Sequence, residues 1–458
     1  MGNLANFDRY IEHLCTALGH KDRNTGLQDY CRGLMLPIHR KSVEPLAAHT
    51  DPLHVPAKHQ SLHHFVAKAG WSDGAVMTLI RDWVVPHLGL DSGCYWIVDD
   101  TGFPKKGTHS VGVARQYCGQ LGKQDNCQVA VSLSLASVQG SVPVGYQLYL
   151  PKDWATDQVR RKKAGVPVGV TFATKPQIAL AQMQEALASG VPVGVVLADA
   201  GYGDETAFRD GITELGMLYA VGIRPGTTVW PPGTAPLPPK PWCGRGIRPT
   251  KLRREPGHEP TPVKTLAMEL PQQAYSAVTW REGTNTDLSS RFAAVRVRPA
   301  HRDYLGTDMR PEEWLLIEWP EGEAEPAKYF LSTAPSDATL EQLVFVAKMR
   351  WRIERDYQEL KQEFGLAQYE GRGWRGFHHH ATLCIAAYAF LLTDRLSQDC
   401  QKKPRSTRSV FPTRRLHSSR QPSESSDTCL TRFRRCECSS PAPSPASFRA
   451  VRVAGMSG

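Results

Sequence analysis

The first ninety residues carry a helical pattern of apolar positions. Apolar residues at steps of three or four form one hydrophobic stripe on a first helix: Leu4, Phe7, Ile11, Leu14 and Leu18. Further helical segments are predicted at residues 24–35, 61–70 and 74–88. We therefore predict an N-terminal helical domain over residues 1–90. Small helical domains commonly dock on DNA, although no helix-turn-helix motif is recognisable here.

From residue 93 the pattern changes to that of strands. Apolar runs separated by turn residues predict hairpin-linked strands near residues 94–98, 110–117, 127–136 and 143–151. These are followed by a helix, a continuous apolar strand, a second helix and a last strand, at residues 175–190, 191–199, 204–215 and 217–223. This order predicts an α/β sheet with mixed strand directions over residues 91–222.

Residues 223–312 interrupt the pattern. They are rich in Pro, Gly and Arg, and we expect an insertion with its own small β unit. The core pattern resumes over residues 313–398, where we expect two strands, a long helix from about 338 to 364 and another from about 377 to 396. Residues 399–458 are rich in Ser, Arg and Pro without periodicity, which predicts a disordered basic tail.

The charge of the chain is localised. The net charge is +10, but residues 401–458 hold twelve Lys and Arg against three acids, and residues 223–310 hold fourteen against seven. The remainder is therefore net acidic, so phosphate binding must come from local patches. No segment approaches the ~20 apolar residues of a membrane span, and no secretory signal is recognisable. The scattered cysteines favour a reducing cytoplasm.

Two strongly apolar segments run directly into aspartate. "YWIVDDTGFPKKG" (95–107) contains Asp99 and Asp100, and "VPVGVVLAD" ends in Asp199. Aspartate is common in turns because its side chain bonds nearby backbone amides, so a purely structural role stays open. If the two strands are neighbours, their C-terminal ends bring the carboxylates into one crevice, where open α/β sheets bind ligands.

A third acid lies in "RWRIERDYQELKQEFGL" (350–366). Arg350, Glu354, Tyr357 and Lys361 are spaced four, three and four residues apart, which puts them on one helical face. An ordinary amphipathic helix with Glu–Lys pairs would give the same stripe. The helix alone therefore does not separate a chemical role from a structural one.

Three blocks together are more specific: "DDTGFPKKGTHSVGVARQYCGQLGKQDNCQVAVSLSLAS", "LADAGYG" and "RWRIERDYQELKQEFGL…YEGRGWRGFHHH". They closely resemble blocks of DDE-type insertion-sequence transposases, over about residues 90–396. The resemblance implies an α/β fold with an RNase H-like mixed sheet flanked by helices, interrupted by a β-rich insertion. It also implies metal-dependent cleavage and strand transfer at the ends of a mobile DNA element.

The resemblance carries the catalytic and metal-binding roles onto Asp100, Asp199 and Glu354. Asp100 directly precedes Thr101 and is preferred, while its neighbour Asp99 stays open as the first acid. The expected cofactor is Mg²⁺ or Mn²⁺, as two ions, because paired hard cations with carboxylate ligands can activate water and stabilise a leaving oxygen.

The same helix implies DNA contacts at Arg350, Tyr357 and Lys361. Arg350, Glu354 and Lys361 fit the spacing of the family's Tyr-Arg-Glu-Lys signature, whereas its Tyr position falls on Ala347. That departure puts one ancillary contact in doubt and leaves the three acids intact.

Weaker signals lie in the insertion and near the C-terminus. Trp280 could stack on a DNA base, although a core role in the β unit is favoured, and we expect DNA contacts from Arg291, Arg296 and Arg298. His378, His379 and His380 make a poor metal site because consecutive helical residues point in different directions. Cys429, Cys436 and Cys438 lack a zinc-site partner set. The tail is either a basic arm or an out-of-frame end.

The sequence therefore favours a bacterial, nucleoid-associated transposase that acts on element ends and target DNA and dimerises when assembled on DNA. A decayed transposase that only binds DNA is the alternative. A hydrolase of small substrates is disfavoured by the basic insertion.

Overall fold

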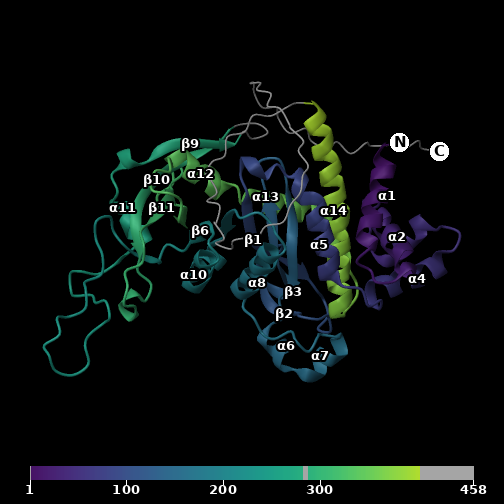
Figure 1. The fold of residues 1–458 in the computed structure, drawn as a ribbon, viewed down its shortest axis with the longest axis horizontal. Coiled ribbons are helices and arrows are strands. Elements are labelled where there is room, and N and C mark those ends of the chain that lie inside the picture. The colour runs from purple at the N-terminus through teal and green to yellow at the C-terminus, as the bar shows by residue number, and fades with distance from the viewer. Residues whose placement is uncertain (1, 282–286, 403–458) are drawn as a thin grey trace, which may run out of the picture.

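The computed structural model describes residues 2–281 and 287–402. One long mixed sheet forms the centre, and helix α14 (Trp374–Lys402) stands between it and helices α1, α2 and α4 of the N-terminal region (Figure 1). Within the described ranges, no helix combines the length and apolar character needed to cross a membrane. The tail beyond residue 402, with its three cysteines, lies outside the described residues.

The first half of the sheet carries the expected mixed topology. Its strands are β1 (Tyr95–Pro104), β2 (Ala114–Cys118), β3 (Lys123–Ala136), β4 (Ser141–Leu148), β5 (Val195–Ala198) and β6 (Leu218–Ile223). β1, β3 and β4 are antiparallel neighbours, whereas β1, β5 and β6 run parallel. The arrangement is that of the RNase H-like α/β fold, as the sequence predicts.

The inserted segment extends this same sheet. Its strands and those that follow are β7 (Thr228–Trp230), β8 (Thr261–Pro262), β9 (Ser276–Arg281), β10 (Leu288–Pro299), β11 (Glu313–Glu318) and β12 (Lys328–Ser332). β12 pairs with β6, and the pairing continues through β11 and β10 to β7 and β8, while β9 pairs with β10. The β-rich insertion is therefore joined edge to edge to the core sheet. The outer edge of β6 needs a partner, since an open edge exposes unpaired backbone groups, and β12 supplies it.

The expected helix over 338–364 is two helices, α12 (Leu340–Lys348) and α13 (Trp351–Gln362), broken at Met349 and Arg350. The two helices share one apolar cluster, which holds Val346 of α12 and Ile353 of α13, and α12 also packs in a second cluster. Leu343 and Val344 of α12 pack with residues of β9, β10 and β11, whereas Ile353 of α13 packs with residues of β1 and β5. The break lets each helix follow its own part of the twisted sheet.

The opposite face of the first half-sheet is covered by α8 (Lys175–Ala188), and α10 (Thr206–Glu214) packs against α8. Trp96 and Val98 of β1 lie in one cluster with Ile178 of α8, while Tyr95 and Ile97 lie in the cluster of α13. The chain also forms four short helices: α6 (Lys152–Thr156), α7 (Gln158–Ala164), α9 (Ala200–Gly203) and α11 (Val263–Glu269). The two faces of β1 thus belong to two different helical layers.

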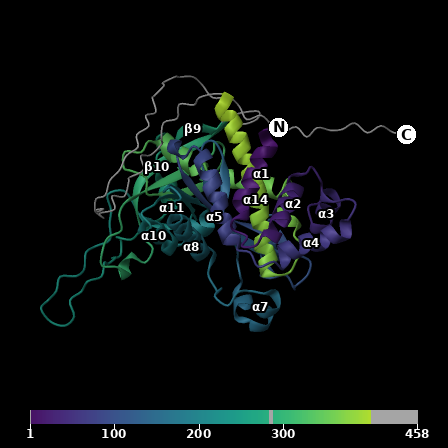
Figure 2. The ribbon, with the colours of Figure 1, turned by 45° about the vertical axis from the view of Figure 1, so that its right-hand side comes forward.

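The N-terminal helices pack around α14 (Figures 1 and 2). They are α1 (Gly2–Cys15), α2 (Asn24–Met35), α3 (Val43–Thr50), α4 (Val55–Ala67) and α5 (Asp73–Val84). The Tyr10 hydroxyl donates to the Ala386 carbonyl at 3.0 Å, and Trp71 stacks on His379 with ring centroids 3.6 Å apart. The N-terminal helices therefore share one hydrophobic core with the rest of the protein.

Candidate active site

The strands that carry the first two acids are parallel neighbours, which meets the condition for a shared crevice. Tyr95, Trp96 and Ile97 of β1 pair with the first three residues of β5, and Asp199 follows β5 directly. β1 does not end at its aspartates, because β3 continues to pair with it as far as Pro104. The acids therefore lie where β5 ends beside a strand that runs on.

Asp199 is held in place by a tight strand-to-helix turn. Its side chain accepts a hydrogen bond from the Gly201 amide at 2.9 Å and so caps α9. α9 lies directly against β6, since a Cβ at Gly203 would come within 2.2 Å of the Gly222 carbonyl oxygen. Glycine at position 203 thus permits the close approach that fixes the carboxylate of Asp199.

Strand alternation separates the two neighbouring aspartates. Successive side chains of a strand point to opposite faces of the sheet. Asp99 continues the row of Tyr95 and Ile97, which packs against α13, and Asp100 continues the row of Trp96 and Val98, which packs against α8. The structure therefore brings Asp99 to the face that carries Glu354.

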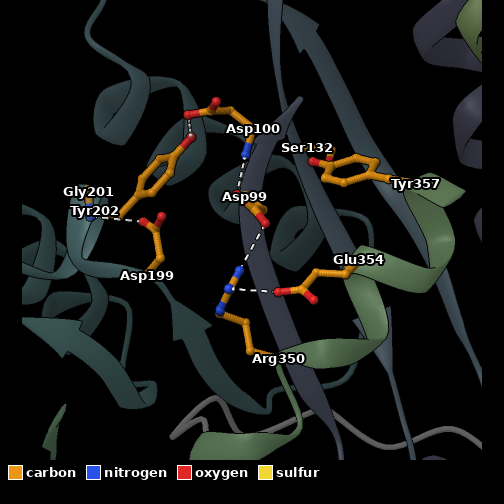
Figure 3. A network of polar contacts seen from close by, with 9 residues as sticks. All are labelled: Asp99, Asp100, Ser132, Asp199, Gly201, Tyr202, Arg350, Glu354 and Tyr357. Carbon is orange, nitrogen blue, oxygen red and sulfur yellow. Dashed lines mark hydrogen bonds and ion pairs between the residues drawn. The ribbon is translucent and has the colours of Figure 1, made fainter. Parts of the chain in front are cut away.

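Arg350 joins Asp99 to Glu354 (Figure 3). Its Nη1 donates to Asp99 Oδ2 at 2.9 Å, and its Nη2 donates to Glu354 Oε1 at 3.0 Å. Glu354 lies in the first turn of α13, where a carboxylate also interacts favourably with the helix dipole. Its side chain is 63% exposed, whereas that of Asp99 is 18% exposed. The result is a partly open acidic site with a guanidinium at its centre.

The pKa of the Asp99 carboxyl is strongly shifted from its ordinary value. Burial raises the pKa of its carboxyl to about 7, Arg350 acts in the opposite direction, and the negative charge of Asp199 raises it further. A carboxyl whose pKa is raised by a neighbouring negative charge favours an added cation beside it. The electrostatics of this face therefore suit a positively charged ligand.

Asp100 has different partners. Its Oδ2 accepts hydrogen bonds from Lys175 Nζ at 2.9 Å and from the Tyr202 hydroxyl at 3.3 Å (Figure 3 shows the second). Lys175 begins α8 and Tyr202 lies in α9, so Asp100 ties both helices to β1. Of the two candidates for the first metal ligand, Asp99 shares the face of Glu354, and Asp100, the preferred one, lies on the opposite face. The choice between them stays a prediction. Lys175 and Tyr202 were not identified from the sequence, because their spacing carries no signal.

The other two residues of the helical stripe bind the protein itself. Tyr357 is buried, and its hydroxyl is 2.7 Å from Ser132 Oγ, which lies opposite Asp99 on β3. Lys361 Nζ donates to the Gly102 carbonyl of β1 at 3.1 Å, and burial lowers its pKa. In this arrangement both side chains position α13 on β1, and Tyr357 has no surface to offer to DNA.

The chemical type of the donor atoms suits a hard divalent cation. Asp99, Asp199 and Glu354 offer carboxylate oxygens, which Mg²⁺ and Mn²⁺ prefer. As the side chains stand, no three His, Cys, Asp or Glu residues within the described ranges are grouped closely enough to hold a metal ion. Arg350 instead places its positive charge between Asp99 and Glu354. The site thus already accommodates a cation between two of its acids.

The insertion residues are engaged within the protein. Trp280 packs edge-on against Phe292, with Lys348 Nζ 4.3 Å from its ring centroid, in agreement with the favoured core role. The three candidate arginines each donate to a nearby backbone carbonyl. Arg291 donates to that of Gln272, Arg296 to that of Glu312 and Arg298 to that of Arg310. Their contact with DNA stays a prediction.

The three consecutive histidines are buried and point to separate partners. His378 accepts from the Leu148 amide, and His379 contacts the Val66 and Trp71 carbonyls. His380 lies between the Tyr30 hydroxyl and the Gly365 carbonyl. As expected from their helical positions, they share no site.

Comparison with known proteins identifies the family of the chain. The family described as DDE superfamily endonuclease matches residues 13–287, more than half of the chain, which includes Asp99, Asp100 and Asp199 but ends before Glu354. A protein of Microchaete diplosiphon named "Probable transposase for insertion sequence element IS701" is 31% identical over 166 residues, which are 36% of this chain and 40% of the relative. The chain thus spans less than half the length of that relative. The family match confirms the resemblance found in the sequence, and the chain belongs to the DDE superfamily endonucleases.

Proposed function

We propose that this protein is a transposase that cuts DNA at the ends of an insertion sequence and joins those ends to a target. We further propose that Asp99, Asp199 and Glu354 hold the divalent metal ions that this reaction needs. The observation that carries the proposal is the bridge that Arg350 forms between Asp99 and Glu354 on one face of β1, near enough to Asp199 for its negative charge to act on Asp99. Family membership supports the class of reaction.

Asp99 replaces Asp100 in this proposal for a geometric reason. A metal shared by three carboxylates requires all three on one face, and Asp100 is directed to α8, where Lys175 and Tyr202 satisfy its Oδ2. We assign Asp100 to the positioning of α8 and α9, and through α9 to the positioning of Asp199.

The residues of the site have different proposed roles in phosphodiester cleavage. Bound Mg²⁺ or Mn²⁺ would supply activation of the attacking water and stabilisation of charge on the leaving oxygen. Asp99 and Asp199 are fixed by adjoining strands, so their separation is set by the sheet. Arg350 uses two of its five N–H groups on carboxylates, which leaves donors for a DNA phosphate. Lys361 holds α13, and with it Glu354, against β1.

DNA is the proposed partner, and assembly as a homodimer on paired element ends is part of the same proposal. Phosphate contacts make affinity fall as salt rises. The proposed DNA contacts are Arg350 and the arginines of the inserted segment, Arg291, Arg296 and Arg298. Trp280 packs in the core against Phe292 of β10, the strand that carries these three arginines.

A cleavage assay tests the proposal. The labelled substrate is a duplex that carries the inverted repeats expected in the DNA flanking the gene. Wild type should nick it with Mg²⁺ or Mn²⁺, bind it without efficient cutting in Ca²⁺, and bind without cutting in EDTA. Asp199→Asn and Glu354→Gln should bind equally well in EDTA and never cut. If the wild-type protein binds the element ends in Mg²⁺ but never cuts them, the protein is a DNA-binding protein without cleavage activity, and the proposal is wrong.

A further inference from the structure

A groove of about 650 Å³ lies away from the acids, where the N-terminal helices, α7 and the segment before α14 meet. Figure 2 shows α7 below α4 and below the N-terminal end of α14. The groove is lined by residues from four separate stretches of the chain, within 30–44, 59–68, 162–165 and 368–376. Segments that are distant in sequence therefore build one concave surface.

Five exposed cations line this groove: Lys68, Lys162, Lys163, Arg372 and Arg375. Within the part of the chain that the structure describes, none of the five forms an ion pair with a carboxylate, whereas the cations of the acidic site are paired. Two acids line the groove: Glu370 is already paired with Arg40, and Glu44 sets one negative charge against the five cations. The groove therefore carries uncompensated positive charge in a part of the protein that is otherwise net acidic.

Helix dipoles explain only some of these cations. Lys68 caps the C-terminus of α4, and Lys162 and Lys163 lie in the last turn of α7, where positive charge is favourable. Arg375 lies in the first turn of α14 and Arg372 just precedes it, where the dipole disfavours a cation. Their presence beside three lysines points to an anionic ligand.

The groove is firmly connected to the acidic site. Lys105 directly follows the end of β1, and its Nζ donates to the Tyr369 carbonyl at 3.1 Å, while the Val111 amide donates to the Arg372 carbonyl at 3.0 Å. Six residue steps along the extended chain lead from Asp99 to Lys105, a span of roughly 20 Å. One turn of B-DNA is longer, at about 34 Å. The contact between Lys105 and the groove residue Tyr369 therefore lies within the length of one helical turn from Asp99.

We propose that this basic groove binds the phosphate backbone of the duplex that flanks the cleavage site. The proposal rests on the proposed function, since it takes the DNA at the acids as given. Lysines and arginines that converge without acidic partners bind phosphates irrespective of base sequence. The groove would thus set the orientation of the DNA, while the acids act on one phosphodiester.

The test compares two double variants of full-length protein. Lys163→Gln/Arg372→Gln removes two charges from the groove. Lys21→Gln/Arg32→Gln, the control, removes the same two residue types from exposed positions outside the groove lining. Binding of a labelled duplex from the DNA flanking the gene is measured in EDTA over a series of salt concentrations. The groove variant should bind about tenfold more weakly at low salt, and its log–log salt slope should be shallower by about two.

The outcomes separate the two proposals. Equal affinities and slopes for the groove and control variants, with a wild type that binds, would overturn the groove alone. A wild type without salt-dependent DNA binding would overturn the proposed function as well. A groove variant that loses stabilisation by inorganic phosphate but keeps wild-type DNA affinity would assign the groove to small anions and so contradict the proposal. Hydroxyl-radical footprints should show protection lost only on the flank, within about one turn of the cut.

Discussion

Asp99 and Asp100 are adjacent in β1, yet they bind cations on opposite faces of the sheet. Asp99 accepts from Arg350 beside α13, and Asp100 accepts from Lys175 of α8, each at 2.9 Å. One residue of the pair therefore faces the proposed catalytic site, and the other faces the helical layer that supports it. Their different surroundings make their roles experimentally separable.

Replacing each aspartate by asparagine should give opposite results. Asp99→Asn should abolish metal-dependent nicking and leave DNA binding in EDTA unchanged, because it removes a proposed metal ligand. Asp100→Asn should keep measurable nicking and lower the free energy of unfolding by about 1–2 kcal/mol, since a charged hydrogen-bond acceptor is lost. Nicking assays and chemical denaturation check both. Loss of nicking in Asp100→Asn with retention in Asp99→Asn would restore Asp100 as the ligand.

Removing Arg350 should change the response of the protein to metal. The guanidinium occupies the space between Asp99 and Glu354, so it competes with any other cation there. Arg350→Gln should lower the metal-free melting temperature and enlarge the rise in melting temperature on addition of Mn²⁺. Arg355→Gln is the matched control, because Arg355 pairs with Glu359 at the same i,i+4 spacing on α13. Equal Mn²⁺ responses in the two variants would contradict a shared cation site.

The sequence predicts most of the sheet because burial imposes clear periodicity. The apolar run before Asp199 is β5, and its parallel pairing with β1 follows from the order of elements. The choice between Asp99 and Asp100 depends instead on which helix covers which face of β1, a tertiary property. Alternation of Tyr95, Ile97 and Asp99 would have indicated a shared face, but not that α13 covers it.

Other differences have similar physical origins. The break at Arg350 is invisible in the helical period, because apolar residues on both sides of it, Val346 and Ile353, pack in the same cluster. The partners of Asp100 come from helices far along the chain. The joining of the insertion to the core through β12 depends on the need of β6 for an edge partner. The local pattern of apolar residues predicts the helices and strands, whereas long-range packing determines which of them are neighbours.

A methyl group at Gly203 should disturb the site through the backbone. Its Cβ would lie 2.2 Å from the Gly222 carbonyl oxygen, which cannot move aside without displacing β6. Gly203→Ala should therefore cost about 1–3 kcal/mol of stability and reduce nicking, because α9 and Asp199 would shift. Gly226→Ala is the control, since its Cβ would meet no atom within 4 Å. Equal unfolding free energies for the two variants would show that α9 is not fixed by this contact.

The buried His380 should make stability fall in mild acid. Burial lowers its pKa to about 4, and its surroundings are the Tyr30 hydroxyl, the Tyr369 ring, the Cys384 thiol and the charge of Lys105. Its pKa in the unfolded chain is about 6.5. The unfolded state thus binds more protons in this range, so the stability due to neutral His380 is complete above pH ~6.5 and is lost as the pH falls towards 4.

The loss attributable to His380 should reach up to about 3 kcal/mol at the acid end of that range. His380→Gln keeps a side chain able to donate and accept but cannot be protonated, so its free energy of unfolding should fall less between pH 7.5 and 5 than that of wild type. His54→Gln, at an exposed position, should keep the wild-type slope. Denaturant titrations across this pH range measure both. Because His378 and His379 are also buried with lowered pKa values, the variant should retain a reduced slope, and an unchanged slope would exclude His380 as a contributor.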